Sequence, residues 1–415
     1  MPEKYLAKHT KWRGEFVLND DGTFTGGQGK RGNGIWEKDG DELILKWYHW
    51  GTQRLEKTEK GYKSDMLKLI HKQSFVSISF CTTCKGRLEH LKETLPENLE
   101  TASKYENMEF VLLDYNSQDG LEEWVRSEMM DYIKSGRLVY YKNSAPKYFD
   151  MSHAKNMVHR LGSNDILCNL DADNKLSDEF IKQLRFEFAN HSGSVLKPNS
   201  NMKGNAGRIS ISRENFFRLR GYDETAYGWG NEDQDFFNKC DIWGLKPIRV
   251  MDAYSIPHSD KERAQNYPTK KIRQSSQTNA KVLKQRMMEG YFISNIHDSF
   301  GEGKVTKNFE EDIVLEELEV LTEKATHVRT YMFSSKYSNE PETRIRFFEG
   351  PNVFLKEIRG STIKGISSYW FEKGTWEEKE STIHMRWKNR ELELFNRDDD
   401  GSFFSENNTL VKTSV

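Results

Sequence analysis

Two aspartates one residue apart, Asp171 and Asp173, follow directly after the apolar run ILCNL. Carboxylate oxygens are preferred ligands of divalent cations such as Mg²⁺ and Mn²⁺. In an open α/β sheet, nucleotides bind just beyond the carboxyl ends of the strands, where this pair is expected to lie. An isolated Asp-x-Asp is more often only a turn, so its context decides whether it is a ligand site.

A second apolar run, MEFVLL, also ends in a carboxylate, that of Asp114, and a polar turn then begins at Asn116. Asp114 is placed to accept hydrogen bonds from a nucleotide base or ribose. The turn residues can instead serve as a helix cap, because a helical pattern begins at Leu121.

The third candidate is the segment GWGNEDQD at residues 228–235. Glycines on either side of Trp229 favour a tight bend that presents the indole, and Glu232 and Asp233 then fall in the first turn of a helix. Acidic residues there stabilise the helix dipole, so a purely structural role stays open. A carboxylate at a helix N-terminus also tends to remain ionised, which suits a general base at neutral pH.

These residues need a scaffold that presents strand ends. Residues from about 70 to 290 alternate short apolar runs with segments that have helical periodicity. Such alternation predicts a Rossmann-like, mostly parallel sheet with helices on both faces. The residues at strand ends are therefore the candidates for ligand binding.

The two ends of the chain read as small β modules, and they resemble each other. GIWEKDGDELILKW (residues 34–47) aligns without a gap with GTWEEKESTIHMRW (374–387), and NDDGTF (19–24) is echoed by DDDGSF (398–403). The order of elements looks different in the two copies. We therefore expect a β module at 1–68, an α/β domain at 69–295, a helical linker at 296–324 and a second β module at 325–415.

The composition excludes several classes of protein. The 415 residues are 36% hydrophobic and 30% charged with a net charge of -2, so no global charge draws the chain to nucleic acid. No apolar run approaches the ~20 residues of a transmembrane helix, and the first residues show no signal core. Four cysteines make no disulfide framework. We expect a cytoplasmic protein, with association at the inner membrane face and homo-oligomerisation both left open.

Taken together, the middle region resembles a family 2 type glycosyltransferase of the GT-A fold. The ordered segments that carry the resemblance are SISFCTTCKGRLEHLKETL, FVLLDYNSQDG, MSHAKNMVHRL, DILCNLDADN and RISISRENFFRLRGYDETAYGWGNEDQDFFNKC. The last is also similar to the carboxyl-terminal signature of β-1,4-galactosyltransferases and the chondroitin-polymerase type. The resemblance covers about half of the chain.

The resemblance implies a role for each matching residue. On the donor side it implies nucleotide or sugar contacts from Arg87, Asp114, Asn116, Asn156, Asp171 and Asp173. It implies a Mn²⁺ or Mg²⁺ ion held by Asp173 and His258, the latter in the segment IPHSDKE. On the acceptor side it implies stacking and binding by Trp229, Gly230 and Glu232, with Asp233 as the general base.

The implied reaction inverts the anomeric carbon and moves a hexose from a UDP-sugar, with galactose or N-acetylgalactosamine favoured, to a glycan hydroxyl in polysaccharide or glycoconjugate synthesis. Asn231 departs from the family pattern, which commonly has glycine there, and this puts the acceptor loop in question. Cys81 and Cys84 form a Cys-x-x-Cys in the expected first nucleotide loop, where packing near the base is favoured over a zinc or redox pair.

Two other functions stay open. A carbohydrate-binding or scaffold protein on an inactive transferase core would use the tryptophans of the terminal modules, although core packing is favoured for these. A nucleotidyltransferase would share the nucleotide and metal needs, but it leaves the Trp-Gly-x-Glu-Asp segment unexplained. The glycine-rich GQGKRG at residues 27–32 fits a dinucleotide fingerprint but sits in a β pattern, which favours a hairpin loop.

Overall fold

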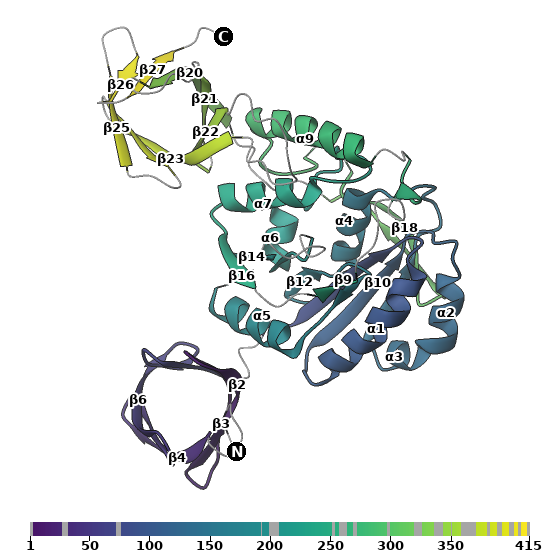
Figure 1. Cartoon of the computed structure of the whole chain (residues 1–415), viewed down its shortest axis with the longest axis vertical. Coiled ribbons are helices and arrows are strands. Elements are labelled where there is room, and N and C mark those ends of the chain that lie inside the picture. The colour runs from purple at the N-terminus through teal and green to yellow at the C-terminus, as the bar shows by residue number, and fades with distance from the viewer. Residues whose placement is uncertain are drawn as a thin grey trace.

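The computed structural model has an α/β core between two small β-barrels, one at each end of the chain (Figure 1). It describes residues 3–26, 32–71, 76–191, 193–198, 207–250, 254–256, 264–268, 272–296, 299–318, 326–335, 343–349, 351–357, 371–379, 382–387, 392–397, 402–405 and 408–412. The predicted α/β core with flanking β modules is thereby confirmed.

The core sheet has nine strands in the order β16-β14-β15-β12-β9-β10-β11-β18-β19. Its centre is parallel and consists of β12 (Ile166–Asn169), β9 (Ile78–Cys84), β10 (Met108–Asp114) and β11 (Leu138–Lys142). On one side, β15 (Ser210–Ser212) runs antiparallel, followed by the parallel pair β14 (Ser194–Pro198) and β16 (Lys246–Val250). On the other side, β18 (Gly303–Lys307) and β19 (Glu311–Leu315) form an antiparallel hairpin.

Helices cover both faces of this sheet because both faces of its central strands are apolar. One buried cluster joins the sheet to α1 (Leu88–Ser103), α2 (Leu121–Glu128) and α5 (Asp178–Asn190). A second cluster, on the opposite face, joins it to α4 (Met151–Leu161), α6 (Arg213–Arg218) and α7 (Glu232–Ile242). The short α3 (Met130–Lys134) follows α2, and α9 (Ile272–Met288) packs on the side nearest the C-terminal barrel.

Three sequence expectations need correction. The sheet is mixed and not mostly parallel, because β15, β18 and β19 run antiparallel to their neighbours. The expected helical linker at 296–324 is wrong, since β18 and β19 add a hairpin to the sheet edge instead. Cys81 and Cys84 lie inside β9 and not in a loop. They belong to different core clusters and are free buried thiols, which leaves them no zinc or redox partnership.

The N-terminal barrel closes in sequence order. Its strands are β1 (Glu3–His9), β2 (Arg13–Leu18), β3 (Thr23–Gly26), β4 (Asn33–Asp39), β5 (Glu42–Trp47), β6 (Gly51–Thr58), β7 (Gly61–Lys63) and β8 (Leu67–His71). Pairing of β1 with β8 closes the barrel, so no strand edge is left unpaired. Aromatic residues fill the interior, as expected for alternating inward side chains.

The C-terminal barrel has the same plan. Its strands are β20 (Thr326–Ser335), β21 (Thr343–Glu349), β22 (Val353–Glu357), β23 (Phe371–Lys379), β24 (Thr382–Trp387), β25 (Leu392–Arg397), β26 (Phe403–Phe404) and β27 (Asn408–Lys412). Pairing of β20 with β27 closes it. The order of elements is therefore the same in both modules, contrary to the sequence expectation.

The predicted repeat is confirmed at the level of register. Gly34 pairs with Trp47 in the first barrel, and Gly374 pairs with Trp387 in the second. Both glycines are required, because a Cβ atom would stand 2.2 Å from the Lys46 carbonyl oxygen in one barrel and 2.1 Å from that of Arg386 in the other. Each tryptophan also meets a phenylalanine edge-on with centroids 4.7 Å apart, Phe24 or Phe354.

The second echo, NDDGTF with DDDGSF, does not join equivalent strands, because Phe24 lies in the third strand of its barrel and Phe403 in the seventh strand of the other. Residues 398–401 lie outside the described residues. Gly22, with φ of 79°, accepts a hydrogen bond from the backbone N–H of Trp36. Its counterpart in the second barrel is Asn352, with φ of 49°, which accepts from Trp376 N–H. Asn and Gly both tolerate this left-handed backbone, so the two barrels share the backbone conformation at this position although the residue types differ.

Each barrel packs on the core through its own contacts. Leu6 and Ile70 of the first barrel share a buried cluster with Phe186 and Ala189 of α5. Phe348, Val353 and Leu355 of the second barrel pack with residues of α9. Among the helices of the described residues, none is long and apolar enough to cross a membrane.

Candidate active site

The candidate carboxylates gather at the edge where the parallel strands end. Asp114 is the last residue of β10, and Asp171 comes two residues after the end of β12. Asp233 is in the first turn of α7 and reaches the same edge from above the sheet. The strand-end geometry that the sequence pattern predicts thus brings together residues about sixty positions apart.

Asp171 and Asp233 flank one glycine, Gly207. A Cβ atom placed on Gly207 would stand 3.1 Å from an oxygen of each carboxylate and 3.4 Å from Lys155 Nζ. Asn169 fixes this side of the cluster, because its amide donates to Asp171 Oδ1 (2.9 Å) and to the Gly207 carbonyl (2.7 Å). Any side chain larger than hydrogen at 207 would push the carboxylates apart.

Lys155, which the sequence analysis did not select, is the cation of this cluster. Its Nζ donates to Asp233 Oδ1 at 2.7 Å and to Glu232 Oε1 at 3.0 Å. The side chain is only 2% exposed, and although burial lowers its pKa, Asp233 and Glu232 outweigh this and hold the pKa well above the ordinary value. Lys155 therefore stays protonated and holds Asp233 in place.

The charges in the cluster are unbalanced. Burial raises the pKa of Asp233 to about 7, with Lys155 opposing the shift and Glu232 and Asp171 adding to it. Burial also raises the pKa of Asp171, and the nearby charge of Asp173 contributes. Among the described residues, one lysine thus acts on three carboxylates, those of Asp171, Glu232 and Asp233. Such an excess of negative charge favours a bound cation.

The residues around Asp173 fit a divalent ion by their chemistry. Asp173 is nearly buried, its Oδ1 accepts from Asn174 Nδ2 at 2.8 Å, and its backbone carbonyl accepts from Ile256 N–H at 2.8 Å. The short strands β13 (Asn174–Lys175) and β17 (Tyr254–Ser255) pair here, which brings the chain to within two residues of position 258. His258 itself lies outside the described residues. Among the described residues, no three His, Cys, Asp or Glu side chains stand in a metal-binding arrangement.

On the predicted donor side, Asp114 is fully buried. It accepts hydrogen bonds from Ser117 N–H (2.7 Å) and the Tyr140 hydroxyl (2.9 Å). Burial raises its pKa, and these two hydrogen bonds oppose the shift. Asn116 has φ of 58° and donates to the Pro146 carbonyl, so the turn after β10 is fixed by its own polar groups.

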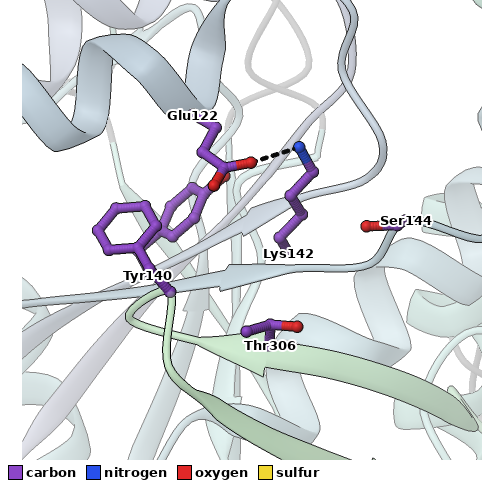
Figure 2. A pocket seen from close by; sticks show the side chains of 6 residues that line it. Glu122, Tyr140, Lys142, Ser144 and Thr306 are labelled. Atoms are coloured by element: carbon purple, nitrogen blue, oxygen red, sulfur yellow. Dashed lines mark hydrogen bonds and ion pairs between the residues drawn. The ribbon is translucent and has the colours of Figure 1, made fainter.

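Beside the end of β11 there is a separate hollow of about 230 Å³ (Figure 2). An ion pair between Lys142 and Glu122, at 2.6 Å, lies in its wall. Tyr140 also lines the hollow and links it to Asp114. None of the carboxylates that surround Lys155 lines this hollow.

Arg87 and Asn156, the other two donor-side predictions, differ in environment. Arg87 is half-buried, caps α1, and is close enough to Tyr267 to affect its pKa. Asn156 is buried on α4, donates to the Tyr222 carbonyl and to Glu224 Oε1, and accepts from Tyr222 N–H. These contacts make Asn156 a brace for the segment that leads to residue 229.

The loop of the acceptor-side predictions rests on α9. The Ser275 hydroxyl accepts from Trp229 N–H at 3.2 Å, and Asn279 donates to the Gly230 carbonyl at 3.1 Å. Asn231 has φ of 73° and donates to the Ser276 carbonyl at 2.7 Å. Asparagine tolerates the left-handed backbone that position 231 adopts, so this residue fits the loop without a glycine.

Tyr267 is a second residue that sequence reasoning missed. It is buried beside Phe149, with ring centroids 5.7 Å apart, and burial raises its pKa well above the ordinary value, with Glu232 adding to the shift. Phe149 N–H donates to the Asn266 carbonyl at 2.8 Å. The segment 264–268 therefore lies over the site, and the basic run that contains it is one for which the sequence favours either a solvated helix or an ordered lid over the donor.

A comparison with known protein families gives a match over part of this site. Residues 190–260, which include Gly207, Glu232 and Asp233, match a family model described as the N-terminal domain of galactosyltransferase. This match supports a glycosyltransferase. No curated protein sequence matches it.

Three solved structures with a partial likeness, two of them named as a mannosyltransferase and a galactosyltransferase, are similar to this chain. The mannosyltransferase PcManGT from Pyrobaculum calidifontis is 17% identical with a TM-score of 0.39, and the match covers 46% of this chain and 62% of that one, less than two thirds of its length. TarS 1–349 of S. aureus, solved with UDP-GlcNAc, is 12% identical with a TM-score of 0.39 and coverage of 51% and 66%. The catalytic domain of Drosophila β1,4-galactosyltransferase 7 is 15% identical with a TM-score of 0.37 and coverage of 61% and 88%.

Proposed function

We propose that this glycosyltransferase is metal-dependent and inverting, and that it transfers a hexose from a UDP-sugar to a hydroxyl of a glycan acceptor in polysaccharide or glycoconjugate synthesis. The donors we favour are UDP-galactose and UDP-N-acetylgalactosamine. The observation that carries the proposal is the convergence of Asp171 and Asp233 on Gly207, with Lys155 bound to Asp233.

Asp233 is the proposed general base. The acceptor oxygen forms its bond to the anomeric carbon while its proton passes to the Asp233 carboxylate, and the bond from that carbon to the diphosphate oxygen breaks. Positioned general bases contribute about 10²- to 10⁴-fold to such steps. Lys155 fixes Asp233 Oδ1 at 2.7 Å, which leaves the other oxygen, Oδ2, to face the acceptor hydroxyl.

Asp173 and His258 are the residues proposed to hold a Mn²⁺ or Mg²⁺ ion. When bound, such an ion would offset the negative charge that develops on the departing diphosphate. The proposed contacts to the nucleotide and donor sugar come from Asp114, Asn116, Arg87 and Asp171. Asn156 acts on this site through the backbone of Tyr222.

The acceptor is proposed to lie against the loop of Trp229 and Gly230. The Trp229 side chain is half-buried, and the contacts with α9 fix the backbone on both sides of it. Glu232 is nearly buried and shares Lys155 with Asp233, so only one of its oxygens is committed by that contact. The Trp229 ring offers an apolar face to a sugar, and the Glu232 carboxylate can accept hydrogen bonds from the hydroxyls of that sugar.

The test is a screen of nucleotide sugars for metal-dependent release of the nucleoside diphosphate. UDP-galactose, UDP-N-acetylgalactosamine, UDP-glucose, UDP-N-acetylglucosamine and GDP-mannose are each incubated with the full chain, with Mn²⁺ or with EDTA. We expect Mn²⁺-dependent release of UDP from a galacto-configured donor. Release that is indifferent to EDTA, or confined to GDP-mannose, would contradict the metal or the donor assignment respectively.

A further inference from the structure

The N-terminal barrel carries its exposed aromatic residues at one end. In an up-and-down barrel alternate turns lie at the same end, so the turns after β1, β5 and β7 gather together. Thr10 N–H bonds to the Met66 carbonyl at 3.0 Å, and the rings of Trp12 and Trp47 stand 6.4 Å apart. The three turns 10–12, 48–50 and 64–66, with Trp47 beneath them, are here called the aromatic end.

The aromatic end presents flat rings to solvent on a rigid base. Tyr48 is 60% exposed and Trp50 is 47% exposed. The Trp50 ring packs on buried Trp47, with centroids 5.1 Å apart, and Trp47 in turn packs on Trp12. Trp50 is therefore supported from below, so a ligand that covers its outer face meets a ring already fixed in orientation.

Closure of the barrel does not need these rings. In the second barrel Trp387 occupies the place of Trp47, with the same register and the same edge-on phenylalanine. By sequence, the three residues that follow it are Lys, Asn and Arg, where the first barrel has Tyr48, His49 and Trp50. Folding alone therefore does not account for the exposed aromatic residues of the first barrel.

Charge separates the two ends of the N-terminal barrel. The described turns of the aromatic end carry Lys11, His49 and a single carboxylate, that of Asp65, and Lys63 stands at its edge. The opposite end, in and beside the turns after β2, β4 and β6, carries the six acidic residues Asp20, Asp21, Asp39, Asp41, Glu42 and Glu59 and one lysine, Lys60. Two of the acids are paired, Asp41 with Lys57 and Glu42 with Arg54, and the end keeps an excess of negative charge. An anionic ligand is therefore attracted to the aromatic end and repelled from the other.

The aromatic end is the end of the barrel nearer to the first turn of α5. Arg13, at the aromatic end of β2, pairs with Glu179 in the first turn of α5 at 2.9 Å. Lys60, in a turn of the acidic end, donates to the Ala189 carbonyl in the last turn of α5 at 2.5 Å. Since α5 begins just after Asp173 and β13, the end of α5 that Arg13 contacts is the one nearer to Asp173 in the chain, and Figure 1 shows the barrel beside α5.

We propose that the aromatic end binds an acidic glycan, a saccharide chain that carries carboxylate or sulfate groups. The rings of Tyr48 and Trp50 stack on the apolar faces of the sugars, while Lys11, Lys63 and His49 contact the anionic groups. Because the aromatic end lies toward the first turn of α5, which follows Asp173 in the chain, we assign this saccharide as the acceptor or its leading segment. That last assignment rests on the proposed function, whereas binding itself does not require transfer.

The experiment measures binding by the full chain with calorimetry and tryptophan fluorescence. The probes are oligogalacturonate for carboxylate groups, heparin oligosaccharide for sulfate groups and dextran as a neutral glycan. We expect the double variant Y48A/W50A to weaken binding of at least one acidic probe by tenfold or more. L394A, which removes an exposed apolar side chain from the second barrel, is expected to bind like the unsubstituted chain.

Several results would overturn the proposal. They are equal binding of dextran, equal loss with L394A, no binding of either acidic probe, or equal binding of polyglutamate, which has charge without sugar. Tighter binding of single-stranded oligothymidylate would instead assign the surface to nucleic acid. If Y48A/W50A unfolds at the same temperature as the unsubstituted protein, its barrel is intact. Acidic-glycan binding by D233N separates this site from the catalytic proposal, because that variant fails only in transfer.

Discussion

Two buried lysines each bridge two carboxylates in this protein, and the surroundings of the two differ. Lys155 contacts Glu232 and Asp233, whereas Lys239 contacts Asp223 at 2.9 Å and Asp235 at 2.7 Å. Helix α7 supplies residues to both clusters. The first cluster lies at the strand-end edge, and the second lies between α7 and α9.

The clusters differ in charge balance and in access to solvent. Arg286 adds a second cation to the Lys239 cluster, 3.1 Å from Asp223, so two cations face two carboxylates. The side chains of Asp223 and Asp235 are 0% and 1% exposed, whereas that of Asp233 is 22% exposed. Burial raises the pKa of Asp223, but Lys239 and Arg286 outweigh it and hold the pKa well below its ordinary value. A balanced, closed cluster stabilises the fold, and an unbalanced, open one is available for chemistry.

The largest effect should come from D233N. Because asparagine keeps the shape of the side chain but cannot accept a proton, we expect transfer to fall by about 10²- to 10⁴-fold, with UDP binding retained. D235N, a matched change two residues further along α7, should lower stability and leave the turnover of the folded protein within a few-fold. Single-turnover rates measure this, and near-normal transfer by D233N would remove Asp233 from the mechanism.

The second-largest effect is a loss of stability in the cluster around Lys239. K239M should destabilise the protein by about 3–5 kcal/mol, because it leaves Asp235 buried without its cation. K155M should cost clearly less, since Asp233 reaches solvent. Denaturant unfolding of both variants gives the comparison, and equal losses of unfolding free energy would show that the two lysines serve the same structural role.

For D173A we expect a smaller and more specific effect, the loss of metal-dependent UDP affinity. If this carboxylate holds the cation, the variant should lose the gain in UDP affinity that Mn²⁺ provides, while its metal-free affinity stays the same. Asp131→Ala, which removes an exposed acid on α3, is the control. Titration calorimetry with and without Mn²⁺ tests this, and an unchanged Mn²⁺ effect in D173A would exclude it as a ligand.

The sequence predicts the alternating core, the paired modules and the carboxylates, because each leaves a local pattern. No local sequence pattern marks Lys155 as a site residue. It becomes buried only because Glu232 and Asp233, nearly eighty residues later in the chain, fold against it. Closure of the barrels rests on pairings such as β1 with β8, which are equally distant in sequence. Asp-Gly turns recur in many hairpins, so the similarity of DDDGSF to NDDGTF does not identify equivalent turns. The residue equivalent to Gly22 is Asn352, which the letters do not reveal.

The pH profile offers the finest test of the comparison between the two lysines. With the pKa of Asp233 raised to about 7, its base form increases as the pH rises through neutrality, so kcat/KM should climb to a plateau above that pH. Lys155 lowers the pKa of Asp233, and K155M should therefore move the rising limb to higher pH.

In K155M, transfer at pH 7 should fall several-fold and largely recover near pH 9, while K155R should keep the original limb. A merely structural role for Lys155 predicts a loss that is equal at every pH. K239M is the control, because Asp223 and Asp235 exchange no proton with the acceptor and its limb should stay in place. A limb that moves in K239M but not in K155M would reverse the assignment of the catalytic and structural clusters.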